Sequence, residues 1–147
     1  MSRLNGRAAA ASMLLRFLSG LLTASILIQF FIAGMASITN AEWWDYHKVW
    51  VSIFQWLVLP LPLVAWFCGK PRAGRTVLAS LPVLQIALQY FLVHRALDGR
   101  LPIGVGLHAV NAALMLIVAT CLRLAAKRAW KIRRFDRDKV PNFYFIN

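Results

Sequence analysis

Four long apolar runs, separated by short polar breaks, dominate the chain. They occupy approximately residues 17–38, 44–67, 76–93 and 103–124, and the last of them reads IGVGLHAVNAALMLIVATCLRL. A helix needs about 20 consecutive apolar residues to cross a bilayer, and each run reaches or approaches that length. The pattern therefore predicts an all-α membrane protein with four transmembrane helices.

Two of the runs carry local irregularities. The first follows an alanine-rich segment that contains arginine, which is also typical of a secretory signal peptide. Its apolar length exceeds that of a usual signal core, so we expect a retained helix. Pro60 and Pro62 interrupt the second run. Proline removes a backbone donor and kinks a helix, which a membrane helix tolerates where its neighbours compensate.

The basic residues gather at alternate breaks between the runs. All but three of the 17 Lys and Arg lie before the first run, within 69–75 or from residue 123 onward, and the exceptions are Lys48, Arg95 and Arg100. Cytoplasmic loops carry the excess of Lys and Arg in membrane proteins. We therefore expect an up-down-up-down bundle with both termini in the cytoplasm, in a multi-pass protein of the cell inner membrane.

The composition divides the chain into a bundle and a tail. Because 60% of the residues are hydrophobic, four helices use nearly the whole chain, and we expect a transmembrane bundle over residues 1–126. A basic and aromatic cytoplasmic tail follows over residues 127–147. The net charge of +12 fits binding to anionic lipid headgroups beside the membrane. No nucleic-acid recognition module accompanies it, so we expect no nucleic-acid partner.

Two histidines within the apolar runs are the candidate functional residues. An ionisable side chain at that depth is costly and usually faces an interior site or a partner. His47 and His108 both lie near the starts of runs that share one direction, so they occupy the same leaflet. Neighbouring helices lie about 8–10 Å apart, so diagonal helices are on the order of 11–14 Å apart. Such a pair suits the axial ligands of a haem iron.

Helical periodicity gives this candidate site its surroundings. At about 100° per residue, His108 shares a stripe with Ala112 and Met115, and the alanine leaves space beside the imidazole. Four basic residues near the outer surface are suited to hold haem propionates by charge-assisted hydrogen bonds, namely Lys48, His94, Arg95 and Arg100. The residues expected around the cofactor are Gln29, Gln89 and Asn111 within the bilayer and Arg95 and Arg100 at its surface.

A second interpretation of the same residues needs no cofactor. Small and polar side chains are common at the interfaces of membrane helices, where they join neighbouring helices. Gln29, Gln85, Gln89 and Asn111 fit that role. A histidine near the membrane surface is more often hydrogen-bonded than a metal ligand, and this applies most to His94.

The order of the polar residues resembles that of an uncharacterised family of small bacterial four-helix membrane proteins, over roughly residues 20–125. The general plan also resembles four-helix b-type cytochrome membrane subunits. Those subunits commonly carry more helix-borne histidines, so two candidate ligands allow one haem b at most. The residues that carry the first resemblance are Gln29-Phe30-Phe31-Ile32-Ala33-Gly34, His47, Gln85 or Gln89, and Leu107-His108-Ala109-Val110-Asn111.

These observations leave two main functional hypotheses. There is no Gly-rich phosphate loop, G-x-S-x-G or H-E-x-x-H motif, so we expect no enzyme. The first hypothesis is a cofactor-free accessory subunit that packs against other membrane protein subunits, with residues 140–147 docking on the partner. The alternative is an electron-transfer subunit with one haem b, its iron held by His47 and His108. A transporter is disfavoured because no inverted repeat and no intramembrane acid are evident.

Overall fold

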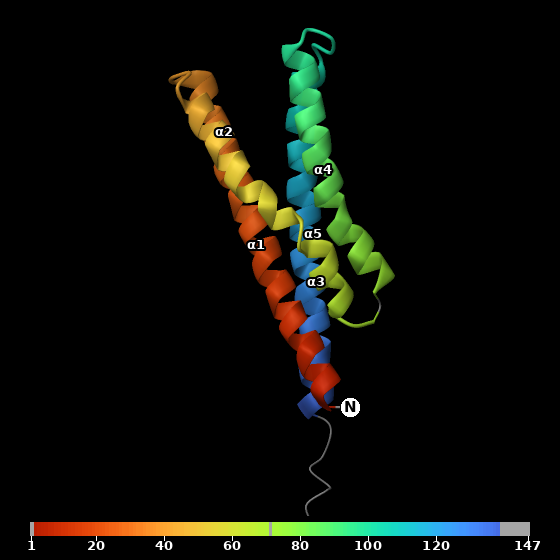
Figure 1. Cartoon of the computed structure of the whole chain (residues 1–147). Coiled ribbons are helices and arrows are strands. Elements are labelled where there is room, and N and C mark those ends of the chain that lie inside the picture. Colours follow the sequence, from red (N-terminus) through yellow and green to blue (C-terminus); the bar gives the residue numbers. More distant parts are fainter. Residues whose placement is uncertain (1, 71, 139–147) are drawn as a thin grey trace, which may run out of the picture.

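The computed structural model describes residues 2–70 and 72–138, with side chains described for 6–70 and 72–131, and its regular structure there is entirely helical. The chain reverses direction at each of three short connections (Figure 1). Four stretches are long and apolar enough to cross a membrane, which confirms the expected class of fold: Gly6–Ile38, Trp43–Phe67, Ala73–Leu97 and Gly104–Lys131. The elements in order are α1 (Ser2–Ile38), α2 (Trp43–Phe54), η1 (Gln55–Val58), α3 (Leu61–Phe67), α4 (Ala73–Leu97) and α5 (Gly104–Asp138).

The first and last helices extend beyond the apolar runs. α1 begins at Ser2, well before residue 17, and α5 continues to Asp138, so the segment expected to be a tail from residue 127 is helical up to that point. Alanine, arginine and lysine are among the strongest helix formers, and both extensions are rich in them. Residues 139–147, which include the proposed docking segment, lie outside the described residues.

The second apolar run forms two helices joined by a 3₁₀ segment. α2 ends at Phe54, η1 covers Gln55–Val58, and α3 begins at Leu61. Pro60 and Pro62 explain the break, because neither has an N–H to donate to the preceding turn. A 3₁₀ segment in mid-helix changes the direction of the chain, and α3 consequently packs against α1 and α4 while α2 packs against α1.

The half of the bundle that contains the start of α1 and the end of α5 is closely packed. α1 lies along α5, with α3 filling the space towards α4 (Figure 1). Small residues let the helix backbones approach each other, as is typical of membrane bundles. The fully buried side chains include Ser12, Leu15, Ser19 and Leu22 of α1, Leu61 and Ala65 of α3, and Ala119, Leu122 and Ala126 of α5.

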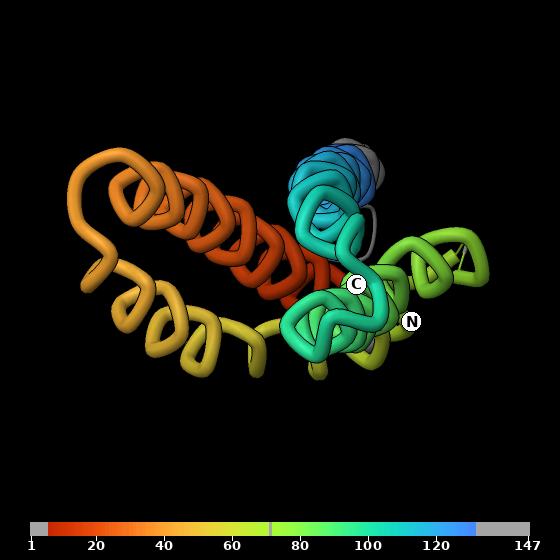
Figure 2. Tube along the Cα trace, turned by 90° about the horizontal axis from the view of Figure 1, so that it is seen from above, coloured from red at the N-terminus to blue at the C-terminus, as the bar shows by residue number. Residues whose placement is uncertain are grey.

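In the other half the helices form two separate pairs. α2 remains against α1 and α4 against α5, while the α1–α2 pair diverges from the α4–α5 pair (Figures 1 and 2). The Trp50 indole donates to the Ser25 carbonyl at 3.0 Å and holds the first pair together. In the second pair, a Cβ on Gly104 would lie 2.6 Å from the Leu92 carbonyl oxygen. The glycine therefore permits a backbone contact that no other residue allows.

Candidate functional site

A cavity of about 580 Å³ lies where the two helix pairs diverge. Its volume is within the range of about 300–1,000 Å³ that small-molecule and cofactor sites occupy. The walls are mainly apolar, and alanines on opposite helices keep the centre empty of large side chains. Ala33, Ala109 and Ala112 contribute to the walls, and Ile26, Phe54 and Met115 close the inner end.

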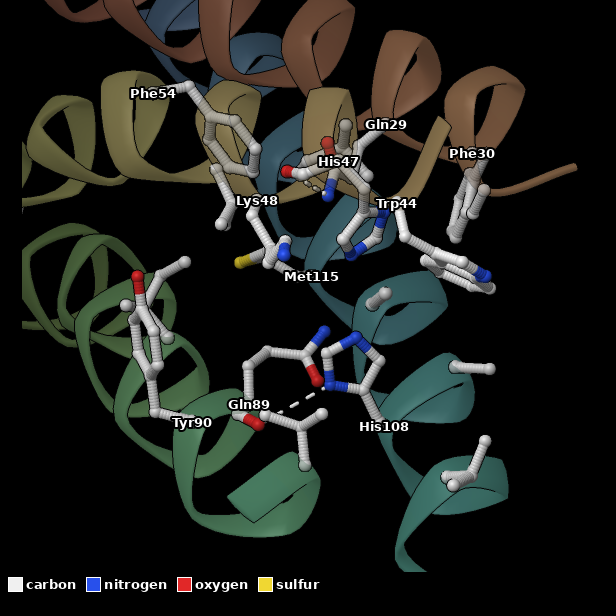
Figure 3. A pocket seen from close by; sticks show the side chains of 18 of the residues that line it. Gln29, Phe30, Trp44, His47, Lys48, Phe54, Gln89, Tyr90, His108 and Met115 are labelled. Carbon is white, nitrogen blue, oxygen red and sulfur yellow. Dashed lines mark hydrogen bonds between the residues drawn. The ribbon is translucent and has the colours of Figure 1, made fainter. Parts of the chain in front are cut away.

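His47 and His108 face each other across this cavity. Their ring centroids are 6.4 Å apart and their planes differ by 44°, and the two rings project from α2 and α5 on opposite walls (Figure 3). The stripe predicted beside His108 is present, because Ala112 and Met115 line the same cavity. The structure thus brings together two ionisable side chains that are 61 positions apart in the sequence.

The α4–α5 pair fixes the orientation of the His108 ring. Its Nδ1 lies 3.3 Å from the carbonyl oxygen of Gln89 (Figure 3). One turn further along, the Asn111 amide donates to the Gln85 carbonyl at 2.9 Å. A histidine whose Nδ1–H donates to a backbone carbonyl keeps a lone pair on Nε2, which is the form that binds a metal. The contact with the Gln89 carbonyl gives His108 this arrangement.

The α1–α2 pair holds His47 through its backbone and a neighbouring ring. The Gln29 amide nitrogen donates to the His47 carbonyl at 3.2 Å. The Trp44 ring lies edge-on to the imidazole, with centroids 5.3 Å apart. The Nδ1 atom of His47 is buried without a hydrogen-bond partner. The backbone is therefore fixed, while the ring still has an unused polar atom.

Buried glutamine oxygens accompany the histidines. The Oε1 atoms of Gln29 and Gln89, both on the cavity lining, have no hydrogen-bond partner. Leaving a polar atom unsatisfied in an apolar environment costs on the order of 1–3 kcal/mol. Three residues of the cavity lining, counting His47 with its Nδ1, therefore hold an unsatisfied polar atom that lies beneath the cavity surface.

The donor set distinguishes between kinds of metal site. Among the described residues, no three His, Cys, Asp or Glu side chains are grouped closely enough to hold a metal ion. A bare ion bound here would have two protein ligands, whereas structural sites usually have four. Two nitrogens bound to one metal at about 2.0 Å would place the ring centroids roughly 6 Å apart, close to the observed 6.4 Å. The residues therefore fit a metal whose other ligands belong to a cofactor.

The remaining predicted site residues lie outside the cavity. Asn111 is buried at the contact between α4 and α5, where it bonds to Gln85. The Arg95 guanidinium lies 5.6 Å from the centre of the Phe91 ring. Arg100 is exposed in the connection before α5. None of the three is among the residues that line the cavity.

Two of the four basic residues expected near the propionates, Lys48 and His94, line the cavity, and so does Tyr90, to which the sequence analysis gave no role. Measured from Gln85, His94 lies on nearly the opposite face of its helix, which is why it was not expected to be an iron ligand. Tyr90 and His94 are four residues apart and share one stripe, which lies roughly 100–140° around the helix from Gln89. The part of α4 that lines the cavity is therefore wider than a single stripe, which periodicity around one glutamine does not reveal.

The fold and the cavity define a helical protein with four candidate membrane spans and a histidine-lined interior site. A family of unknown function (DUF6220) matches residues 29–96. The matched part contains Gln29, His47 and Gln89, whereas His108 lies beyond it. No curated protein and no solved structure matches the chain. The similarity thus names no activity.

Proposed function

We propose that this protein binds one haem b between His47 and His108 and serves in electron transfer within a membrane. The observation that carries the proposal is the pair of imidazoles, 6.4 Å apart, facing each other across a largely apolar cavity of about 580 Å³. Haem ligation by histidines on facing helices of a bundle is well established as a structural principle.

Each residue of the site has a distinct part in this proposal. His47 and His108 would hold the iron through one ring nitrogen each, and the Gln89 carbonyl holds the His108 ring in the orientation that leaves Nε2 available. Gln29 or Gln89 offers an oxygen that can accept the Nδ1–H of His47, since a ligating histidine usually donates its other ring N–H. Ala109 and Ala112 leave room for the macrocycle.

The chemistry that haem supplies is the reversible transfer of one electron at its iron. If both histidines held the iron, the site would be suited to electron transfer and not to binding oxygen or a substrate. The mainly apolar walls would limit the access of water, which is one of the means by which proteins set a haem potential. The residues therefore favour electron transfer over oxygen chemistry.

The charge distribution supports a membrane orientation for this site. The start of α1 and the start of α4 lie towards the same end of the bundle (Figure 1). The first carries Arg7 and Arg16, and the second carries Arg72 and Arg75. Following the bias of cytoplasmic segments towards Lys and Arg, we infer that both termini are cytoplasmic, in a bacterial inner membrane. The cavity then opens towards the non-cytoplasmic side.

Cysteine labelling of Gly74→Cys and Gly99→Cys, in a background without Cys68 and Cys121, tests this orientation. Labelling of position 74 from outside contradicts it.

The visible spectrum of the purified protein tests the haem proposal. We expect a low-spin spectrum in protein produced with sufficient haem, and its loss in His47→Ala and in His108→Ala. The matched control is His94→Ala, a third histidine on the same cavity, which should keep the low-spin spectrum. A colourless wild-type preparation that contains no iron and does not take up added haemin contradicts the proposal.

A role as an accessory subunit is the second candidate. The observation that favours it is the shortness of the connections between the described helices, which leaves no extramembrane domain among them. Partner contacts would then involve the lipid-facing helix surfaces and the basic C-terminal segment. Deletion of residues 140–147 tests this role, since it should reduce co-purification of membrane partners while leaving the helical bundle folded. Unchanged recovery of every partner contradicts it.

A further inference from the structure

The cavity has basic side chains on two of its walls and no acidic ones. Lys48 reaches it from α2 and His94 from α4, while no Asp or Glu is among the described residues that line it. Both basic residues are exposed, unlike Gln29 and Gln89 deeper in the site. The cavity therefore has a cationic outer part and a neutral, mainly apolar inner part.

Lys48 is available for a ligand despite its present ion pair. Its Nζ lies 2.7 Å from the Asp45 carboxylate, and the two side chains are 72% and 76% exposed. Exposed pairs of this kind contribute about 0–1 kcal/mol. Lys48 follows His47 directly in the sequence, and a lysine side chain is flexible enough to turn from one anionic partner to another. A better-placed carboxylate in the cavity can therefore replace Asp45.

His94 is oriented for the same task from the opposite wall. Its Nδ1 lies 2.8 Å from the Tyr90 carbonyl oxygen, which fixes the ring and leaves Nε2 unengaged by that contact. In the imidazolium form both ring nitrogens are donors, so Nδ1–H remains on the carbonyl while Nε2–H is presented to an anion. Tyr90 itself donates to Gln55 at 2.8 Å and is thereby fixed.

We infer that Lys48 and His94 bind the carboxylates of the molecule that fills the cavity, which under the proposed function are the propionates of haem. This inference rests on the proposed function and identifies which residues orient the cofactor. The sequence offered four basic residues for this role, Lys48, His94, Arg95 and Arg100, and of these neither arginine is on the cavity lining. Charge-assisted hydrogen bonds to a carboxylate are roughly twice as strong as neutral ones. These contacts therefore favour a ligand with free carboxylates over the corresponding ester.

A comparison of haemin with haemin dimethyl ester tests the inference. The ester has the same macrocycle and iron but no propionate charge. Purified protein in detergent is titrated with each compound, and the low-spin spectrum reports binding. We expect wild type to prefer the free acid, and the ratio of the two affinities to fall about tenfold in Lys48→Met, as loss of a hydrogen bond to a charged group implies. His94→Gln should lower the ratio by a smaller factor.

The controls separate this inference from the function on which it rests. Arg100→Met removes a cation from the same end of the bundle but not from the cavity, and should leave the ratio unchanged. An equal ratio in wild type and Lys48→Met, with both compounds giving low-spin spectra, overturns the inference and leaves the haem proposal standing. Absence of a low-spin spectrum with either compound overturns the haem proposal itself. Because Lys48 and His94 are exposed, neither substitution should affect folding.

Discussion

The two halves of the bundle are built from similar residues but packed differently. In the half with the start of α1, one cluster of side chains without exposed surface includes Leu15, Leu22, Ala119 and Leu122. In the other half, alanines stand opposite alanines and polar side chains, and a cavity remains. The difference lies in the pairing across the interface. A large side chain against a small one fills the space, whereas small residues on both walls of diverging helices leave it open.

This contrast suggests that the cavity is a specified feature of the fold. A packing defect in a membrane bundle would be lined by apolar atoms alone, since an unsatisfied polar atom in an apolar environment adds a cost of its own. Here three lining residues, Gln29, Gln89 and His47, hold unsatisfied polar atoms beneath the cavity surface, a cost that apolar residues at these positions would avoid. The closely packed half provides the stability that such a site requires.

The largest expected effect comes from placing the same large side chain in each half. Ala119→Phe inserts a ring where the alanine is fully buried, and we expect destabilisation by about 3 kcal/mol, since overpacking a core typically costs about 1–3 kcal/mol. Ala112→Phe extends into the cavity and should leave the folded bundle within about 1 kcal/mol of wild type. Unfolding in mixed detergent with increasing dodecyl sulfate measures both changes.

The same pair separates stability from ligand binding. Ala112→Phe should abolish uptake of haemin because the ring occupies the ligand space, although the protein remains folded. If both variants lose stability equally, the cavity is smaller in the membrane than in the structure, and the distinction between the halves is wrong.

A smaller effect is expected at the first turn of α5, where two glycines differ in their surroundings. A Cβ on Gly104 would meet the Leu92 carbonyl at 2.6 Å, whereas nothing lies within 4 Å of one on Gly106. We expect Gly104→Ala to destabilise by about 1–2 kcal/mol, because the α4–α5 pair must separate. Gly106→Ala should stabilise by about 0.5–1 kcal/mol through its higher helix propensity. Thermal unfolding in one detergent compares them, and equal shifts would show that α4 and α5 are not in backbone contact.

Much of the fold follows from the sequence because hydrophobic length and periodicity are local properties. The four spans and the buried stripes through His108 and Met115 were predicted from them. The cavity could not be predicted, because the divergence of the helix pairs depends on where Pro60 and Pro62 break the second run and on the contact at Gly104. Both are matters of tertiary geometry. Periodicity alone therefore placed the two histidines in one leaflet without giving their separation.

The sequence also could not tell which basic residues near the outer surface line the cavity. Lys48, His94, Arg95 and Arg100 were all candidates for the propionates because they are basic and near the predicted membrane boundary. Such a criterion cannot tell which side of a helix faces the interior. Arg95 lies over Phe91, whereas Lys48 and His94 lie on helix faces towards the cavity. The face of each helix, set by its packing partner, decided between residues that composition treats alike.

The smallest expected effect concerns two amides on either side of the boundary between packed contact and cavity. Asn111→Leu removes a hydrogen bond to the Gln85 carbonyl, and we expect a loss of stability of about 0.6–1 kcal/mol, typical of such bonds between membrane helices.

Gln89→Leu removes a buried side-chain oxygen that has no partner, while the backbone carbonyl of residue 89 still bonds to His108. Replacing an unsatisfied polar group with an apolar one of similar size is neutral or stabilising, so the empty protein should be as stable as wild type or more so. Haemin binding should weaken if the amide supports the His47 ring. Stability measured with and without haemin separates these effects, and a destabilised empty Gln89→Leu would show that the oxygen already has a partner, such as an ordered water, in the membrane.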